Sequence, residues 1–125
     1  MDQKICLDTD FCIAILKQQP NYEALLKSIL YSETFITSVS TFELLLRKTN
    51  IYQVENFIKD LNLLDFDSRA ARKASNIQKE LMAVGKIIDI RDLFIASTAI
   101  TNGCVLATLN KKHFENIKEL KLADI

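Results

Sequence analysis

The sequence predicts an α/β fold with a mainly parallel central sheet of about four to five strands flanked by helices. Short continuous apolar runs recur along the chain, as in strands that are buried on both faces of a sheet. Between these runs lie segments whose apolar residues repeat at helical spacing. Since strands that alternate with helices are typical of a parallel sheet, we expect one compact domain over residues 1–125.

The composition agrees with this fold class. The chain has 125 residues, 49% of them hydrophobic, with only two Gly and one Pro, which indicates a single packed core rather than disorder. Sixteen basic and sixteen acidic residues cancel, so overall charge gives no signal for nucleic acid, although a local basic rim beside an acidic pocket remains compatible with it.

The cysteines and the apolar runs indicate a cytoplasmic protein with no membrane association. Cys6, Cys12 and Cys104 are odd in number, lack Cys-x-x-Cys spacing and lie in apolar runs, so we expect buried free thiols. The sequence has no apolar run of roughly 18 residues and no signal-peptide pattern.

The first half of the chain begins with an apolar strand at 4–7 and a short buried helix at 11–16. A second helix starts at Pro20 and Asn21, and a β-rich run follows at 34–37. The next helix starts within residues 38–43 and should end at Thr49 and Asn50. The apolar stripe of the second helix consists of Tyr22, Leu25, Leu26, Ile29 and Leu30.

The second half continues the alternation. A fourth helix is marked by Val54, Phe57, Ile58 and Leu61, and residues 63–66 form a plausible third strand. Asp67 can cap a long helix that Gly85 ends. Another helix covers 93–100, followed by a strand at 104–108. The stripe of the long helix is Ala70, Ala74, Ile77, Leu81 and Val84, and the tail residues Ile117, Leu120 and Leu122 suggest one more edge strand.

Asp8, Glu43 and Asp92 are the candidate site residues, because each lies at a helix start beside a strand end. Asp8 ends a strand that looks central and buried. Asp92 shares a helix stripe with apolar residues, whereas Asp89 is well explained as an N-cap. A charge on a buried face costs several kcal/mol unless something neutralises it.

Each of these acids also has a structural interpretation. Asp92 can favour the helix dipole from the first turn. Glu43 fits a capping box in which its side chain returns to the backbone N–H of Ser40. Asp10 can cap the first helix or lie at the rim of the site, and His113, alone in a polar loop, is typical of a solvated side chain.

The strand ends of a parallel sheet converge on one edge, so these carboxylates are expected to cluster. Clustered carboxylates repel unless they are protonated or bind a cation, and oxygen ligands favour hard ions such as Mg²⁺ or Mn²⁺. Such ions suit the hydrolysis of phosphodiester bonds. No glycine-rich phosphate loop and no spacing for a nucleophilic triad is present, so any chemistry belongs to the carboxylates.

Four segments in this order resemble the PIN-domain family, and within it the VapC-type toxins. They are Leu-Asp-Thr-Asp at 7–10, Ser-Val-Ser-Thr-Phe-Glu at 38–43, Asp-Leu-Phe-Ile-Ala-Ser-Thr-Ala at 92–99 and Leu-Ala-Thr-Leu-Asn at 106–110. The resemblance implies a Mg²⁺- or Mn²⁺-dependent endoribonuclease that acts on RNA, forms homodimers and is inhibited by a small cognate antitoxin. Asp8, Glu43 and Asp92 match the acidic metal positions of the family, and Thr9 and Ser38 match accessory polar positions.

The chain departs from the family pattern after its last buried strand. Many relatives carry a further acid there, whereas this chain has Asn110 at the polar position and His113 before Phe114. A second metal would then bind weakly, or its ligands would include Asn110, Asp89 or Asp10. Arg91, Lys111 and Lys112 lie near the predicted site and are candidates for contacts with RNA phosphates as well as for ordinary solvated surface.

Two other functions remain open from the sequence. In a HAD-type phosphatase or phosphotransferase, Asp8 and Asp10 would form the nucleophile pair, although the chain is short for that fold. A degenerate PIN module would bind RNA or a protein without cleaving. We also expect a homodimer, because the sheet of so small a domain is unlikely to cover every apolar stripe. The stripes in question contain Leu25, Leu26, Ile29, Leu30, Phe57 and Ile58.

Overall fold

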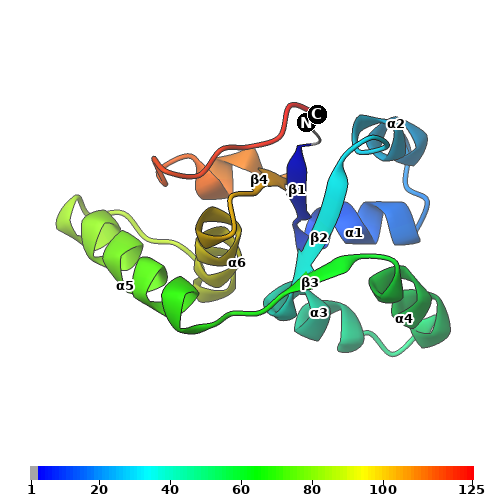
Figure 1. Ribbon diagram of the computed structural model, residues 1–125, viewed down its shortest axis with the longest axis horizontal. Helices are drawn as coiled ribbons and strands as arrows, with labels where there is room; N and C mark the ends of the chain where they lie inside the picture. The colour runs from blue at the N-terminus through cyan, green and yellow to red at the C-terminus, as the bar shows by residue number, and fades with distance from the viewer. Residues whose placement is uncertain (1–2) are drawn as a thin grey trace.

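The computed structural model describes residues 3–125, and its centre is a four-stranded parallel sheet with helices on both faces (Figure 1). The strands are β1 (Lys4–Leu7), β2 (Glu33–Thr37), β3 (Asn62–Leu64) and β4 (Val105–Ala107). The helices are α1 (Thr9–Leu16), α2 (Tyr22–Ser28), α3 (Ser38–Leu45), α4 (Ile51–Lys59), α5 (Ser68–Ala83), α6 (Ile90–Thr101) and the 3₁₀ helix η1 (Lys111–Phe114). The predicted fold class is confirmed.

The strand order β3-β2-β1-β4 creates a switch point between β1 and β4. From β1 the chain moves outward through β2 and β3, and then returns to pair β4 with the other side of β1. Cys6 therefore has Phe35 as its partner on one side and Leu106 on the other. In open α/β sheets, ligands bind at the carboxyl ends of the strands beside such a point, so this edge is the place to look for a site.

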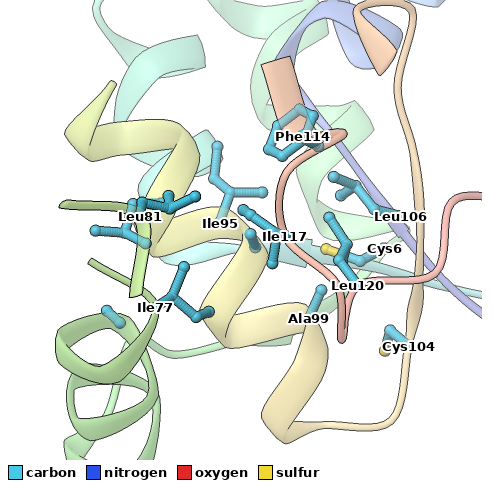
Figure 2. Close-up of a cluster of buried hydrophobic side chains, with 13 residues drawn as sticks. Cys6, Ile77, Leu81, Ile95, Ala99, Cys104, Leu106, Phe114, Ile117 and Leu120 are labelled. Carbon is cyan, nitrogen blue, oxygen red and sulfur yellow. The ribbon is translucent and has the colours of Figure 1, made fainter. Parts of the chain in front are cut away.

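One face of the sheet packs against α5, α6 and the C-terminal segment. Figure 1 shows α5 and α6 together on this side, and Figure 2 shows Cys6 and Leu106 meeting Ile95 and Phe114 in the cluster. Alternate residues of a strand point to opposite faces, and so Ile5 and Leu7 contribute to the other side instead.

The second face is covered by α1 to α4. Ile5, Leu7 and Ile36 of the sheet pack there with Phe11 of α1 and Leu44 of α3. Because apolar side chains cover both faces of the same short strands, the continuous apolar runs of the sequence follow directly from this arrangement.

Several helix and strand boundaries differ from the prediction. The second helix ends at Ser28, and Ile29 is its C-cap. The third ends at Leu45, short of the predicted stop at Thr49, because Leu45 and Leu46 are already exposed and a further turn would bury no more apolar surface. Asn50, with φ 57°, precedes α4. The third strand lies at Asn62–Leu64 instead of 63–66.

The tail forms a bridge to the sheet but not the predicted edge strand. Leu122 pairs with Leu106 as an isolated parallel bridge, supported by a 2.8 Å hydrogen bond from the Ala123 N–H to the Leu106 carbonyl. The long helix begins with the predicted cap, since Asp67 Oδ1 accepts from the Ala70 N–H at 3.0 Å. Val84 is its C-cap and is exposed, so it does not belong to the buried stripe.

Most of the apolar residues that were expected to remain exposed are covered. Ile29 is buried, and Leu25, Phe57 and Ile58 pack partly into the core, which leaves only Leu26 and Leu30 of the six expected residues as large exposed side chains. All three cysteines are buried free thiols, as predicted. No helix of the described residues is long and apolar enough to cross a membrane.

Candidate active site

A cavity of about 320 Å³ opens at the carboxyl ends of β1 and β4. It brings together the three predicted carboxylates, Asp8, Glu43 and Asp92, although they come from three separate parts of the chain. Five carboxylates and one guanidinium group face this space. Its lining residues are Asp8, Thr9, Asp10, Ile13, Glu43, Asp89, Arg91, Asp92, Asn110 and His113.

Asp8 lies at the bottom of the site, 5% exposed, between the end of β1 and the start of α1. Its Oδ1 accepts a 2.8 Å hydrogen bond from the Thr9 N–H, which makes it the N-cap of α1. Its Oδ2 accepts from the Thr108 hydroxyl at 2.8 Å, across the switch point. One carboxylate oxygen is therefore held by the start of α1, and the other by the residue that follows β4.

Burial and a neighbouring charge make Asp8 unusually basic. Loss of water contact is the main cause that raises its pKa from 3.8 to about 7, and the negative charge of Asp10 adds to the rise. Hydrogen bonds from Thr108 and Thr9 act in the opposite direction but do not cancel it. A bound cation would favour the ionised carboxylate in the same place.

Asp10 and Asn110 join the first helix to the loop after β4. The Asn110 Nδ2 donates to Asp10 Oδ2 at 2.8 Å, and the Leu109 N–H donates to Asp10 Oδ1 at 3.3 Å. Asp10 therefore lies at the rim of the site, and Asp8, not Asp10, caps the first helix. The side chain of Asn110 makes no capping hydrogen bond to η1.

Glu43 does not close the predicted capping box. The N-cap of α3 is Thr37, whose hydroxyl accepts from the Ser40 N–H at 3.0 Å, so Ser40 lies inside the helix. The carboxylate of Glu43 instead accepts from the Thr9 hydroxyl at 2.7 Å, and Thr9 Oγ1 also lies 2.9 Å from Ser40 Oγ. Three polar side chains of α1 and α3 thus hold one another at the cavity wall.

Asp92 and Asp89 enter the site from the start of α6. Asp89 is the N-cap, as predicted, since its Oδ1 accepts from the Arg91 N–H at 2.9 Å. Asp92 lies in the first turn with a side chain that is 24% exposed. Burial raises the pKa of Asp92 above 3.8, and the charge of Asp89 contributes in the same direction, while His113 opposes the shift.

Arg91 offsets part of this negative charge, and His113 contacts it. Arg91 Nη1 lies 3.4 Å from Glu43 Oε2, and its Nε lies 3.7 Å from Asp89 Oδ1. His113 Nδ1 lies 3.5 Å from Asp92 Oδ2, so this histidine is both exposed and part of the cavity wall.

The remaining predicted site residues lie outside this cavity. The Ser38 hydroxyl accepts a 3.1 Å hydrogen bond from the Phe66 N–H and so fixes the loop after β3. Lys111 and Lys112 line a neighbouring hollow. Thr108 and Ser40 were not among the predicted site residues. The sequence signals for Thr108 were its place directly after an apolar run and within the family-like segment at 106–110.

The donor set suits a hard divalent cation. Five carboxylates and the Asn110 amide supply oxygen donors, and Asp8 has a charge whose cost a cation would offset. Among residues 3–125, no three Asp, Glu, His or Cys side chains are already arranged to hold one ion. In this conformation Arg91 pairs with Glu43 Oε2 and His113 with Asp92 Oδ2, so these two oxygens would bind a metal only if the pairs open.

The comparisons with known proteins agree on one family. A family model described as PIN domain matches residues 5–120. The chain is 32% identical over 128 residues to the tRNA(fMet)-specific endonuclease VapC of Salmonella typhimurium, with 97% of each chain covered. It is 34% identical over 126 residues to Ribonuclease VapC1 of Methanocaldococcus jannaschii, which covers 97% of this chain and 86% of that protein.

Solved structures show the same similarity. The structure resembles a chain of the DNA-bound VapBC from Salmonella typhimurium, with a TM-score of 0.84, 29% identity and 96% of each chain covered. A chain of VapBC2 from Rickettsia felis, bound to a DNA fragment from its promoter, aligns with a TM-score of 0.83 and 26% identity over 96% of this chain and 97% of that one.

Proposed function

Because this chain belongs to the PIN-domain family, we propose that it is a metal-dependent endoribonuclease and the toxin of a toxin–antitoxin pair. One structural observation supports the proposal above all. Asp8, Glu43 and Asp92 come from three distant segments and line one cavity at the switch point of the sheet. A packed core alone gives no reason to gather five carboxylates in one place.

We propose that Asp8, Glu43 and Asp92 bind Mg²⁺ or Mn²⁺, with Asp10, Asp89 and Asn110 as further oxygen donors nearby. When bound, the cation orients and activates a water and stabilises negative charge on the attacked phosphodiester. The protein positions these ligands through Thr9, which holds Glu43, and through Thr108, which holds Asp8. Arg91 is free to contact an RNA phosphate when its pair with Glu43 opens.

The PIN match removes support for a HAD-type phosphotransferase. In addition, both oxygens of Asp8 accept hydrogen bonds, from Thr9 and Thr108. These bonds fix the orientation of the carboxylate, as is typical of a residue that binds a metal ion. A binding module without catalysis has no observation in its favour, since all three acids are present.

Several further features of the biology follow from this proposal. The VapBC structures that this chain resembles support a small antitoxin as its partner. We propose that the antitoxin covers the acidic edge, that the toxin acts in the cytoplasm where its RNA is found, and that residues 1–125 form a single nuclease domain.

Cleavage of RNA by the purified protein tests the function. Relatives from Salmonella typhimurium and Shigella flexneri are named tRNA(fMet)-specific endonucleases, so initiator tRNA is the first substrate to use. We expect cleavage with Mg²⁺ or Mn²⁺, none with EDTA, and none with Asp92→Asn. Glu55→Gln, an exposed carboxylate on α4, is the matched control and should cleave like the wild type. Tight RNA binding without cleavage under every metal condition would contradict the nuclease and favour a binding module.

A further inference from the structure

A second hollow, of about 620 Å³, lies beside the acidic cavity. The two share Asn110 and His113 in their walls, so they lie next to each other at the loop after β4. Leu25, Leu109 and Ile125 form the apolar part of the second hollow. Its volume is within the range of about 300–1,000 Å³ that is typical of small-molecule sites.

The chemistry of this hollow is opposite to that of its neighbour. Lys111 and Lys112 line it, and none of the described residues in its wall is acidic. Leu109 is 46% exposed, so its apolar surface is accessible to a ligand in this hollow. Apolar surface beside two ammonium groups suits a ligand that is flat and apolar on one side and anionic on the other.

The backbone segment that carries the two lysines is held in place at both ends. Both lie on η1, which ends at Phe114, a side chain that is 1% exposed in the core (Figure 2). At its start, η1 follows Asn110, whose amide is hydrogen-bonded to Asp10 of the acidic cavity. The position of the lysines relative to the carboxylates is therefore set by a buried anchor at one end and a hydrogen bond at the other.

We propose that this hollow is a nucleotide subsite for the RNA residue next to the cleaved phosphodiester. The base lies against Leu109 and its apolar neighbours, and the phosphate of the same nucleotide binds Lys111 and Lys112. This inference rests on the proposed ribonuclease function, and it adds the loop after β4 to the cationic contacts that Arg91 would make with RNA. The attraction between this phosphate and the two lysine ammonium groups offsets the repulsion that the five carboxylates exert on the RNA backbone.

RNA binding without cleavage tests the subsite. A fluorescent single-stranded 12-nucleotide RNA is titrated by anisotropy in EDTA, from low to physiological salt, so that the result does not depend on catalysis. For Lys111→Gln/Lys112→Gln we expect weaker binding and a slope of log K against log salt that is smaller by about 0.7 for each lysine. Lys59→Gln/Lys118→Gln, two exposed lysines outside this hollow, should bind with the wild-type slope.

The apolar half of the subsite can be tested separately from the lysines, because it should affect RNA affinity but not its salt dependence. For Leu109→Ala we expect affinity for RNA to fall about five-fold, at the lower end of what one base contact contributes, with no change in the salt slope. Binding of heparin, which has charge but no bases, should be unaffected by Leu109→Ala and weakened by the lysine variant. Thermal melts of each variant confirm the fold.

Two results would overturn the subsite. One is an equal loss of RNA binding in the two lysine pairs, and the other is wild-type RNA affinity in Leu109→Ala, which would leave a general polyanion surface. If the subsite variants behave as expected and the wild-type protein still fails to cleave RNA with any metal, the proposed nuclease is wrong while the binding site stands.

Discussion

At the scale of single residues, the buried carboxylate of Asp8 determines how the metal-free protein responds to pH. Its pKa is 3.8 in an unstructured chain and about 7 in the fold, so the native state binds more protons between these values. The stability that this group contributes is complete below pH 4 and is lost as pH rises through 7. Ionised Asp8 therefore destabilises the metal-free fold.

We expect Asp8→Asn to abolish cleavage and to stabilise the metal-free protein at pH 8. Asn retains the cap of α1 and removes the buried charge, so the free energy of unfolding should rise on the order of a few kcal/mol, since one pKa unit corresponds to about 1.4 kcal/mol. Urea unfolding in EDTA at pH 5 and pH 8 measures this, and the gain should shrink at pH 5. Asp92→Asn should change stability in the same direction, because the pKa of Asp92 is also raised. A variant less stable than wild type at pH 8 would show that the charge of Asp8 is compensated within the protein.

Asn110 is the residue at which this chain leaves the family pattern, and the structure places its amide on the wall of the acidic cavity. We expect Asn110→Asp to tighten Mn²⁺ binding about tenfold or more, because one added charge within about 4 Å of a divalent ion contributes more than about 1.4 kcal/mol. Without metal, the same variant should be less stable, since Asp10 loses a 2.8 Å donor and gains a repelling carboxylate.

Calorimetric titration of both proteins measures the affinity and the number of ions. Equal affinity and equal stoichiometry would exclude position 110 from the metal centre and leave a site of three carboxylates. Leu109→Ala is the control in the same loop, because its backbone donor to Asp10 is retained.

At the scale of elements, α3 depends on a cap at the end of β2. Thr37 is fully buried, and its hydroxyl accepts the Ser40 N–H. The same helix has Glu43 one turn further on, so the cap also aligns a candidate metal ligand. The segment contains several Ser and Thr residues in a row, which is why the sequence pattern alone selected Ser40 as the cap and misassigned Glu43.

We expect Thr37→Val, which keeps the shape and removes the acceptor, to lower the free energy of unfolding by about 1–2 kcal/mol. Urea unfolding should show a lower midpoint and an unchanged slope. Thr41→Val is the matched control, because the Thr41 hydroxyl only bonds back to the Thr37 carbonyl within the helix. An equal loss in both variants would mean that the cost comes from the added methyl group instead of the lost cap.

The helices and strands were predictable where burial is local. Ile5, Cys6 and Leu7 form an apolar run, which is typical of a strand that is covered on both faces. Asp67 caps the helix that contains Ala70, as its position directly before the helical pattern predicts. The structure of the short tail was not predictable in this way, because Leu122 makes one bridge to the sheet where three or four would be needed for a strand.

The site was predictable only in part, because its contacts span the chain. Their positions at helix starts beside strand ends, together with the family resemblance, selected the three acids, but nothing near Asp8 in sequence indicates that Thr108, 100 residues away, donates to it. The same holds for His113, whose partner Asp92 lies on another element. A lone histidine in a polar loop has no local pattern that distinguishes it from ordinary surface.

At the scale of the whole molecule, exposed apolar side chains at the end of α2 favour association. Leu26 is 41% exposed, Leu30 63% and Tyr31 86%, and they lie close together in the chain. We expect a homodimer at micromolar concentration, with the acidic edge open to RNA. In sedimentation experiments the wild-type protein should be a dimer. The Leu30→Glu variant should shift toward monomer.

Met82→Glu is the control for an exposed apolar residue elsewhere, on α5, and should sediment like the wild type. A wild-type protein that sediments only as a monomer at micromolar concentration would contradict the predicted homodimer. If Met82→Glu dissociates the dimer and Leu30→Glu does not, the interface lies on α5 instead.

The bond between Asp8 and Thr108 has a consequence for the timing of toxicity during translation. The two residues are 100 positions apart, and β1 lacks its β4 neighbour until the last part of the chain has emerged. A nascent chain whose β4 segment is still in the ribosome exit tunnel therefore has Asp8 without its Thr108 donor, and the acidic cavity lacks the wall formed by Asn110 and His113. The acidic edge that the proposed antitoxin would cover therefore forms only after β4 has paired with β1.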